Sequence, residues 1–228
     1  MDMPSPNWII IQWANIAGCL MVFVIYELYL HRVIRHSLMK TARGAHALIR
    51  SKWVKSVMSR PGSEVLAIQT LRNSVMAASF MATTAVLALS ATLTLSGIGN
   101  QGNSLWELSH AKNIGFNIFA VKLLLLAGSF FISFLFMAMA VRFFNHAGYL
   151  ITAEGSQDEV LRSQALAIAY LNRAGNHYSF GLRAFFTCIP FLAGLFSTYL
   201  MLPGSVLLIL VLHWFDRIPY DEQQRTAK

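Results

Sequence analysis

Three ionisable side chains interrupt the long apolar stretches of this chain. Charge at such places is rare and is a candidate for ion binding or proton transfer. Glu27 lies near the end of the first stretch, Lys122 near the start of the third, and His213 near the end of the last. Side chains this close to an end can also reach the surface or pair with a neighbouring charge. We expect Glu27 to reach the surface or to pair with Arg32, Arg72 or Arg142, and Lys122 to extend to the surface.

Further polar residues gather at one end of the same stretches. This candidate polar cluster comprises Glu27, Arg72, Asn73, Arg142, Asn145, His146 and Arg183. If the stretches form helices that end at one level, these side chains lie close together around Glu27. The cluster is then either a network that caps the helix ends, which we favour, or a site for an anion or a lipid headgroup.

A basic segment with apolar residues between its charges occupies residues 44–58. Its pattern is typical of an amphipathic helix that lies in the headgroup layer of an anionic membrane. The residues predicted to contact lipid headgroups are Arg50, Lys52, Trp53 and Lys55. Pro61-Gly62 is expected to end this helix, and the next helix to start near Ser63-Glu64.

The sequence contains no phosphate-binding glycine loop, no serine-hydrolase elbow and no His or Cys spacing typical of zinc or iron sites. We therefore predict no catalytic, cofactor-binding or metal-binding residue. The interpretation as an enzyme has no positive support, although a membrane enzyme that acts on lipid stays open.

Four apolar stretches must position these side chains. They cover about residues 8–30, 74–98, 116–141 and 184–215, in a chain that is 56% hydrophobic and 12% charged. Each is longer than the ~20 residues with which a helix crosses a bilayer core. We predict an all-α fold in one integral membrane domain, residues 1–228, with four transmembrane helices and two cytoplasmic amphipathic helices.

Charge is distributed unevenly between the ends of these stretches. The loop 31–73 carries nine basic residues and one acid, and the loop 142–183 carries four basic residues. The positive-inside rule places both loops in the cytoplasm and the N-terminus outside. With four spans the C-terminus lies outside as well; if residues 204–215 re-enter the membrane, it is cytoplasmic instead. We expect location in the cell (inner) membrane, and no binding of nucleic acid.

The second amphipathic segment follows the third span. Ser156 and Glu159 have the spacing of a capping box, which starts a helix expected to run to about residues 170–173. The segment 175–178 begins with glycine and is expected to break it. Pro190 and Pro203-Gly204 are expected to kink or break the long fourth stretch.

The second span is rich in small residues. Ser74, Ala78 and Ala82 recur every four positions, a spacing that allows two helices to approach closely. We expect this helix to be the most enclosed of the four.

Several segments resemble the domain of unknown function 599 family. They are Tyr26-Glu-Leu-Tyr29, Leu66-Ala-Ile-Gln-Thr-Leu-Arg-Asn-Ser-Val-Met76, Met81-Ala-Thr-Thr84, Val141-Arg-Phe-Phe-Asn-His146 and Gly181-Leu-Arg-Ala-Phe-Phe-Thr-Cys-Ile-Pro190. The resemblance covers residues 20–215 and implies a four-span membrane protein without an assigned activity. The chain departs from the family pattern at Leu195-Phe-Ser-Thr198.

Two classes of function fit these observations best. The leading hypothesis is a non-catalytic structural or accessory subunit that self-associates or joins a larger membrane complex, with anionic lipids as further partners. The alternative is a small transporter or channel that uses Glu27 and the arginines of the candidate polar cluster.

Overall fold

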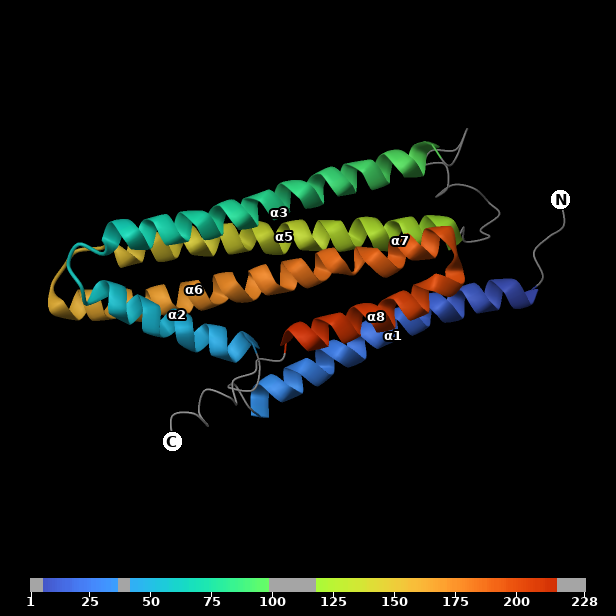
Figure 1. The fold of residues 1–228 in the computed structure, drawn as a ribbon. Coiled ribbons are helices and arrows are strands. Elements are labelled where there is room, and N and C mark those ends of the chain that lie inside the picture. The colour runs from blue at the N-terminus through green and yellow to red at the C-terminus, as the bar shows by residue number, and fades with distance from the viewer. Residues whose placement is uncertain (1–5, 37–41, 99–117, 217–228) are drawn as a thin grey trace.

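The computed structural model describes residues 6–36, 42–98 and 118–216, and nearly all of these residues lie in helices. The helices are α1 (Pro6–His36), α2 (Ala42–Met58), α3 (Glu64–Ile98), α5 (Ile118–Ile151), α6 (Gln157–Phe186), α7 (Cys188–Phe196) and α8 (Thr198–Asp216). No strand occurs in these ranges, so the predicted all-α class is confirmed for the described part of the chain. The long helices lie side by side in an elongated bundle (Figure 1).

The bundle has more helices of transmembrane length than the sequence predicted. Five segments of the described chain are long and apolar enough to cross a membrane, and they are Ile10–Leu30, Glu64–Leu95, Ile118–Ile151, Gln157–Phe196 and Thr198–Asp216. The prediction of four spans with two separate amphipathic helices is therefore wrong. The second amphipathic segment is the first half of α6, which continues through α7 as one long rod (Figure 1).

The extra helix arises because the predicted fourth span, 184–215, folds back on itself. Ser197 has an extended backbone, with φ −152° and ψ 127°, and it separates α7 from α8. After this turn α8 runs back beside α1 (Figure 1). Neither proline makes the break: Pro190 lies in the first turn of α7, where a missing N–H costs little, and Pro203 lies inside α8.

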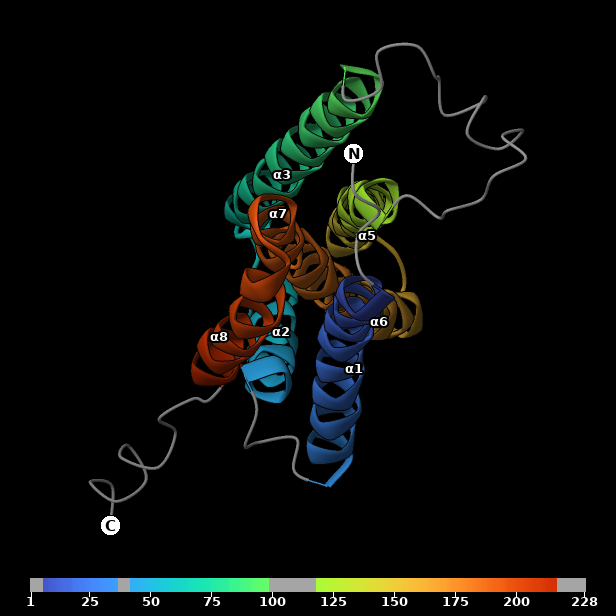
Figure 2. The same ribbon diagram turned by 90° about the vertical axis from the view of Figure 1, so that its right-hand side faces the viewer.

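α5 is the central helix of the bundle. Its buried residues include a series spaced alternately by three and four positions, namely Leu123, Leu126, Phe130, Ser133, Met137, Ala140, Phe144, Ala147 and Ile151. That period of 3.5 is the pattern of left-handed helix pairs, in which side chains of one helix fill gaps on the next. Viewed along the bundle, α5 and the α6–α7 rod lie between α3 and the α1–α8 pair (Figure 2).

The interior contains two clusters of buried apolar side chains. One joins α2, α3, α5 and α6 around Met137 and Phe144, and the other joins α1, α5, α7 and α8 around Leu126 and Met201. α3 contributes a single buried stripe that includes Ala67, Leu71, Ala78 and Ala85. The prediction that the second span is the most enclosed helix is wrong, because α5 is buried to a larger extent.

Local signals set most of the remaining helix ends. α2 ends at Met58, and Gly62 adopts φ +86°, a left-handed conformation that glycine enters without strain. α3 then starts at Glu64, as predicted. The predicted break at 175–178 is wrong, since α6 passes through it unbroken. Gly175 is instead a point of close approach: a Cβ atom there would lie 2.4 Å from Nη1 of Arg50.

Ser156 caps α6, as the sequence predicted. The carboxylate of Glu159 accepts hydrogen bonds from the Ser156 backbone N–H, at 2.8 Å, and from its hydroxyl, at 2.9 Å. These bonds favour the charged form and lower the pKa of Glu159 below its ordinary value. The contribution of the cap to stability is thus complete above the ordinary glutamate range of about pH 4–5 and is lost as the pH falls through the lower, folded-state pKa.

We expect an NMR titration of the Glu159 carboxyl to show this lowered pKa in the native protein. In Ser156→Gly the backbone N–H remains and the hydroxyl is lost, so part of the shift should disappear. Equal titration midpoints in the two proteins would show that the hydroxyl contributes nothing to the cap.

Candidate functional site

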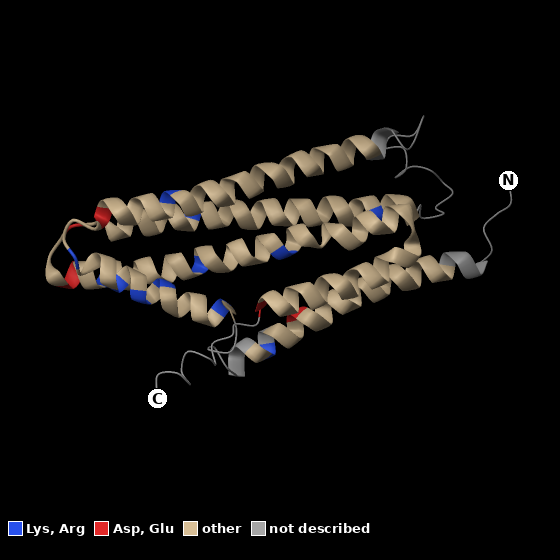
Figure 3. Cartoon of the chain, in the orientation of Figure 1, with Lys and Arg blue, Asp and Glu red and all other residues tan. Residues whose placement is uncertain are grey.

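Most charged residues gather at one end of the bundle, beyond a slab in which α5 carries no charge (Figure 3). On α5, Lys122 and Arg142 lie on either side of 19 residues without charge, which correspond to about 28 Å of helix, close to the thickness of a bilayer core. The charged end carries α2 and the start of α6 (Figure 3). The basic loops thus share one end of the bundle, and the side of the membrane that this end faces stays a prediction.

An ion-pair network lies inside this slab. It is centred on Arg183 of α6, two residues after Gly181, whose carbonyl accepts a hydrogen bond from Ser133 near the middle of the slab on α5. Nη1 of Arg183, on α6, lies 3.1 Å from Oε1 of Glu27, on α1. Nη2 of the same arginine pairs with Oδ2 of Asp216, the last residue of α8. The Arg183 side chain is 10% exposed, the Asp216 side chain 18% and the Glu27 side chain 44%. One buried guanidinium therefore joins three helices through two carboxylates.

Two further residues complete this network, which we call the Arg183 cluster. The Tyr26 hydroxyl donates to Oδ2 of Asp216 at 2.7 Å, and its ring lies 5.8 Å from Cζ of Arg183. Arg43, at the start of α2, stacks on the Phe180 ring with its Cζ 4.3 Å from the ring centre. Burial, and next the repulsion by Arg183, lower the pKa of Arg43, while the two carboxylates oppose this. The cluster carries two arginines and two acids, so its charges balance.

The structure does not gather the whole candidate polar cluster around Glu27. Of its seven members, only Glu27 and Arg183 form an ion pair with each other within the described residues. Arg72 and Asn145 line a cavity of about 430 Å³ between α3 and α5. The His146 ring packs on Tyr170 at 5.6 Å, Arg142 is exposed, and Asn73 lines a different pocket. Their function as a site stays a prediction.

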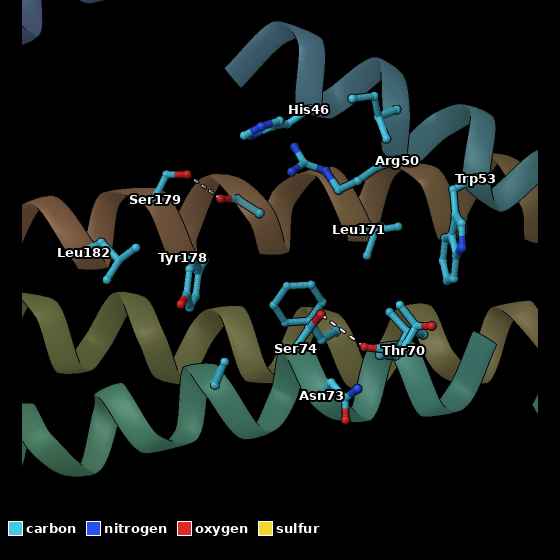
Figure 4. A pocket seen from close by; sticks show the side chains of 15 residues that line it. His46, Arg50, Trp53, Thr70, Asn73, Ser74, Leu171, Tyr178, Ser179 and Leu182 are labelled. Atoms are coloured by element: carbon cyan, nitrogen blue, oxygen red, sulfur yellow. Dashed lines mark hydrogen bonds between the residues drawn. The ribbon is translucent and has the colours of Figure 1, made fainter. Parts of the chain in front are cut away.

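The α2 residues predicted to contact lipid point in two directions. Lys52 and Lys55 are exposed, whereas Arg50 and Trp53 turn inward towards α6 and α3 (Figure 4). They line a cavity of about 790 Å³ between α2, α3, α5 and α6, which we call the α2 pocket. Nε of Arg50 donates to Oδ1 of Asn172 at 3.0 Å.

Lys122 does not extend to the surface as predicted. It is only 5% exposed, and its Nζ donates to the Gly194 carbonyl at 2.9 Å and to the Thr198 hydroxyl at 2.7 Å. The last carbonyls of a helix have no partner within that helix. Lys122 therefore satisfies the end of α7 at the point where the chain reverses, and it ties α5 to the α7–α8 turn.

Sequence reasoning missed three of these residues. Asp216 belongs to a tail in which acidic and basic residues balance, and only the reversal at Ser197 brings it next to Arg183. Arg43 is one of nine basic residues in its loop, and nothing in its spacing marks it as buried. Tyr26 is singled out in the sequence only as part of a segment that resembles the domain of unknown function 599 family. Its position next to Glu27, one residue along the helix, is the signal that could have included it.

Comparison with known proteins identifies a family without adding a function. Residues 14–219 match the model of the family described as "Protein of unknown function, DUF599", and the chain belongs to that family. No curated protein and no solved structure matches the chain. The resemblance noted in the sequence is thus confirmed, and the function has to be argued from the molecule itself.

Proposed function

We propose that this protein is a non-catalytic membrane protein of structural or accessory type, which associates with copies of itself or with a larger membrane complex. The observation that carries this proposal is a polar stripe along the outer side of α3. Its members are small, hydroxylated and exposed, and they are Ser79, Thr83, Ser90 and Thr94. Small and hydroxyl-bearing residues are enriched where membrane helices pack together, because they allow close approach and hydrogen bonding.

The roles of the buried charges support the same proposal. Arg183 is bound by Glu27 and Asp216, and Lys122 is bound by the end of α7. Both cations hold neighbouring helices together. This role is expected in a protein that serves as a rigid part of an assembly. In a proton or ion pathway, such groups would instead bind and release the proton or ion.

The proposal predicts that the protein purified in mild detergent contains more than one chain per particle or a co-purifying protein. Light scattering coupled to gel filtration measures this mass directly. A lone monomer without any co-purifying protein would contradict the proposal.

A substitution on the stripe tests its geometry. Thr83→Phe places a bulky ring on the outer side of α3 and is expected to weaken association by about tenfold, which is the ~1.4 kcal/mol typical of such membrane contacts. The matched control is Leu207→Phe on α8, where the native side chain is 64% exposed. Energy transfer between labelled copies in vesicles reports the dissociation constant. If the two substitutions change the dissociation constant equally, the outer side of α3 is not the interface.

The alternative, a small transporter or channel, makes a different prediction about Glu27. Its carboxylate is 44% exposed beside a buried arginine, so a passing cation could compete for it. Ion flux in proteoliposomes that is abolished by Glu27→Gln would favour this alternative over the structural proposal, and flux unaffected by the change would count against it.

A further inference from the structure

The α2 pocket combines a cation with apolar walls at the level of the membrane surface. Arg50 and His46 enter it from α2, while Leu71, Phe144, Leu171 and Leu182 supply apolar wall from α3, α5 and α6. Thr70 and Ser74 of α3 and Tyr178 of α6 add hydroxyl groups (Figure 4). A volume of about 790 Å³ is within the range of ligand pockets in proteins.

Arg50 has no acidic partner in this pocket. None of the 15 described residues that line the pocket is an aspartate or glutamate, and the hydrogen bond to Asn172 occupies only Nε. Burial without a counter-ion lowers the pKa of Arg50. A partly buried guanidinium in this state gains most from an anion that accepts from its two remaining nitrogens, as a phosphate does.

The bundle holds the guanidinium in place for such an anion. Gly175 of α6 has no side chain, and Nη1 of Arg50 occupies the space where a Cβ atom would be, 2.4 Å away. The neighbouring Lys52 and Lys55 on the same helix are exposed and do not line the pocket. Ile49, which lines the pocket, is 59% exposed, so the pocket continues to an apolar outer surface.

The position of the pocket decides between a lipid and a soluble ligand. On α3 its lining residues include Thr70, Asn73, Ser74 and Ala77, which straddle Arg72, the last charged residue before the uncharged part of that helix. The pocket therefore spans the boundary where lipid headgroups meet acyl chains. We propose that the α2 pocket binds one anionic phospholipid, with its phosphate on Arg50 and the start of an acyl chain along the apolar wall. This inference is independent of the association proposed above.

Trp53 lines the pocket and provides the probe. The chain has five tryptophans, and a variant with the other four changed to phenylalanine leaves Trp53 as the single emitter. In vesicles of phosphatidylglycerol and phosphatidylcholine with matched chains, only one of the two lipids is brominated at a time. The quenching of Trp53 gives the relative affinity of the pocket for the two lipids. We expect this affinity to be about tenfold higher for phosphatidylglycerol than for phosphatidylcholine, because a hydrogen bond between charged groups contributes a free energy of that order.

Two pairs of variants distinguish lipid binding in the α2 pocket from general attraction of anionic lipid to the basic surface. Arg50→Gln is expected to abolish the preference, whereas Lys52→Gln removes the same charge from the same helix and is expected to retain it. Gly175→Ala keeps every charge but displaces the guanidinium, and is expected to abolish the preference as well. Its control is Gly128→Ala, where a Cβ atom meets nothing within 4 Å. Alanine favours a helix more than glycine does, so neither change should unfold the chain.

Three results would overturn the proposal. One is equal quenching of Trp53 by the two brominated lipids in the otherwise native chain. Another is an equal loss in Arg50→Gln and Lys52→Gln, which would show attraction to the surface alone. The third is full displacement of brominated phosphatidylglycerol by excess inorganic phosphate, which would identify a site for a soluble anion. Thermal unfolding of each variant checks that the fold is intact.

Discussion

Replacing Arg183 with glutamine is expected to lower the free energy of unfolding by about 3–5 kcal/mol, because Glu27 and Asp216 are left without their shared partner. For a chain of this size that corresponds to a fall in Tm of roughly 6–20 °C. The measurement is thermal unfolding in detergent. The matched control is Arg173→Gln on the same helix, where the native side chain is exposed, and its effect should stay within about 0.5 kcal/mol.

A double substitution sharpens this prediction. In Arg183→Gln/Asp216→Asn both the cation and one of its two carboxylates are neutral, so less buried charge is left unpaired. The double variant is therefore expected to be more stable than Arg183→Gln alone. If the losses in free energy of unfolding of the two single variants simply add up in the double variant, Arg183 and Asp216 do not interact. The Arg183 cluster would then not hold α6 and α8 together.

Replacing Lys122 with methionine is expected to lower the free energy of unfolding by about 1–3 kcal/mol. The thioether fills a similar volume, but it cannot donate, so the Gly194 carbonyl and the Thr198 hydroxyl lose their buried partner. Thr198→Val removes only one acceptor and is expected to cost about 1 kcal/mol.

The control for Lys122→Met is Leu124→Met, which introduces the same residue on the same helix where the native side chain is 72% exposed. Thermal unfolding again provides the comparison. If the two changes have equal, small effects, Lys122 reaches the surface after all and contributes nothing to the α7–α8 turn.

Much of the helical framework could be predicted because strong local signals mark it. The segment 44–58 and the observed α2, Ala42–Met58, nearly coincide, since its basic and apolar residues alternate and Pro61-Gly62 follows. Ser156 and Glu159 likewise identify the start of α6 from their spacing alone. Such signals depend only on neighbours in the sequence.

The reversal at Ser197 could not be predicted in the same way. Pro190 and Pro203 are stronger breakers than serine, yet Pro190 lies in the first turn of α7, where a missing N–H costs little, and Pro203 lies inside α8. The one local hint was that the chain departs from the family pattern at Leu195-Phe-Ser-Thr198. The turn is held by Lys122, which lies more than 70 positions away in the sequence.

The Arg183 cluster was predicted only in part for the same reason. The sequence suggests Arg32, Arg72 or Arg142 as partners of Glu27 and places Arg183 only in the wider candidate polar cluster, whereas the structure pairs Glu27 with Arg183. Which arginine pairs with Glu27, and that Asp216 joins the pair, depends on the path of α8. The inward position of Arg50 likewise depends on the missing side chain of Gly175, a contact between two helices that periodicity cannot show.

The central claim is a bundle with five membrane-crossing segments, in which the Arg183 cluster joins α1, α6 and α8. The side of the membrane on which α8 ends, at Asp216, tests this claim most directly. A reporter fused directly after Asp216, at the end of α8, is expected to lie on the same side as one inserted at Gly155, in the exposed turn between α5 and α6. Reporters on opposite sides would mean four crossings, and would contradict both the reversal at Ser197 and the pairing of Asp216 with Arg183.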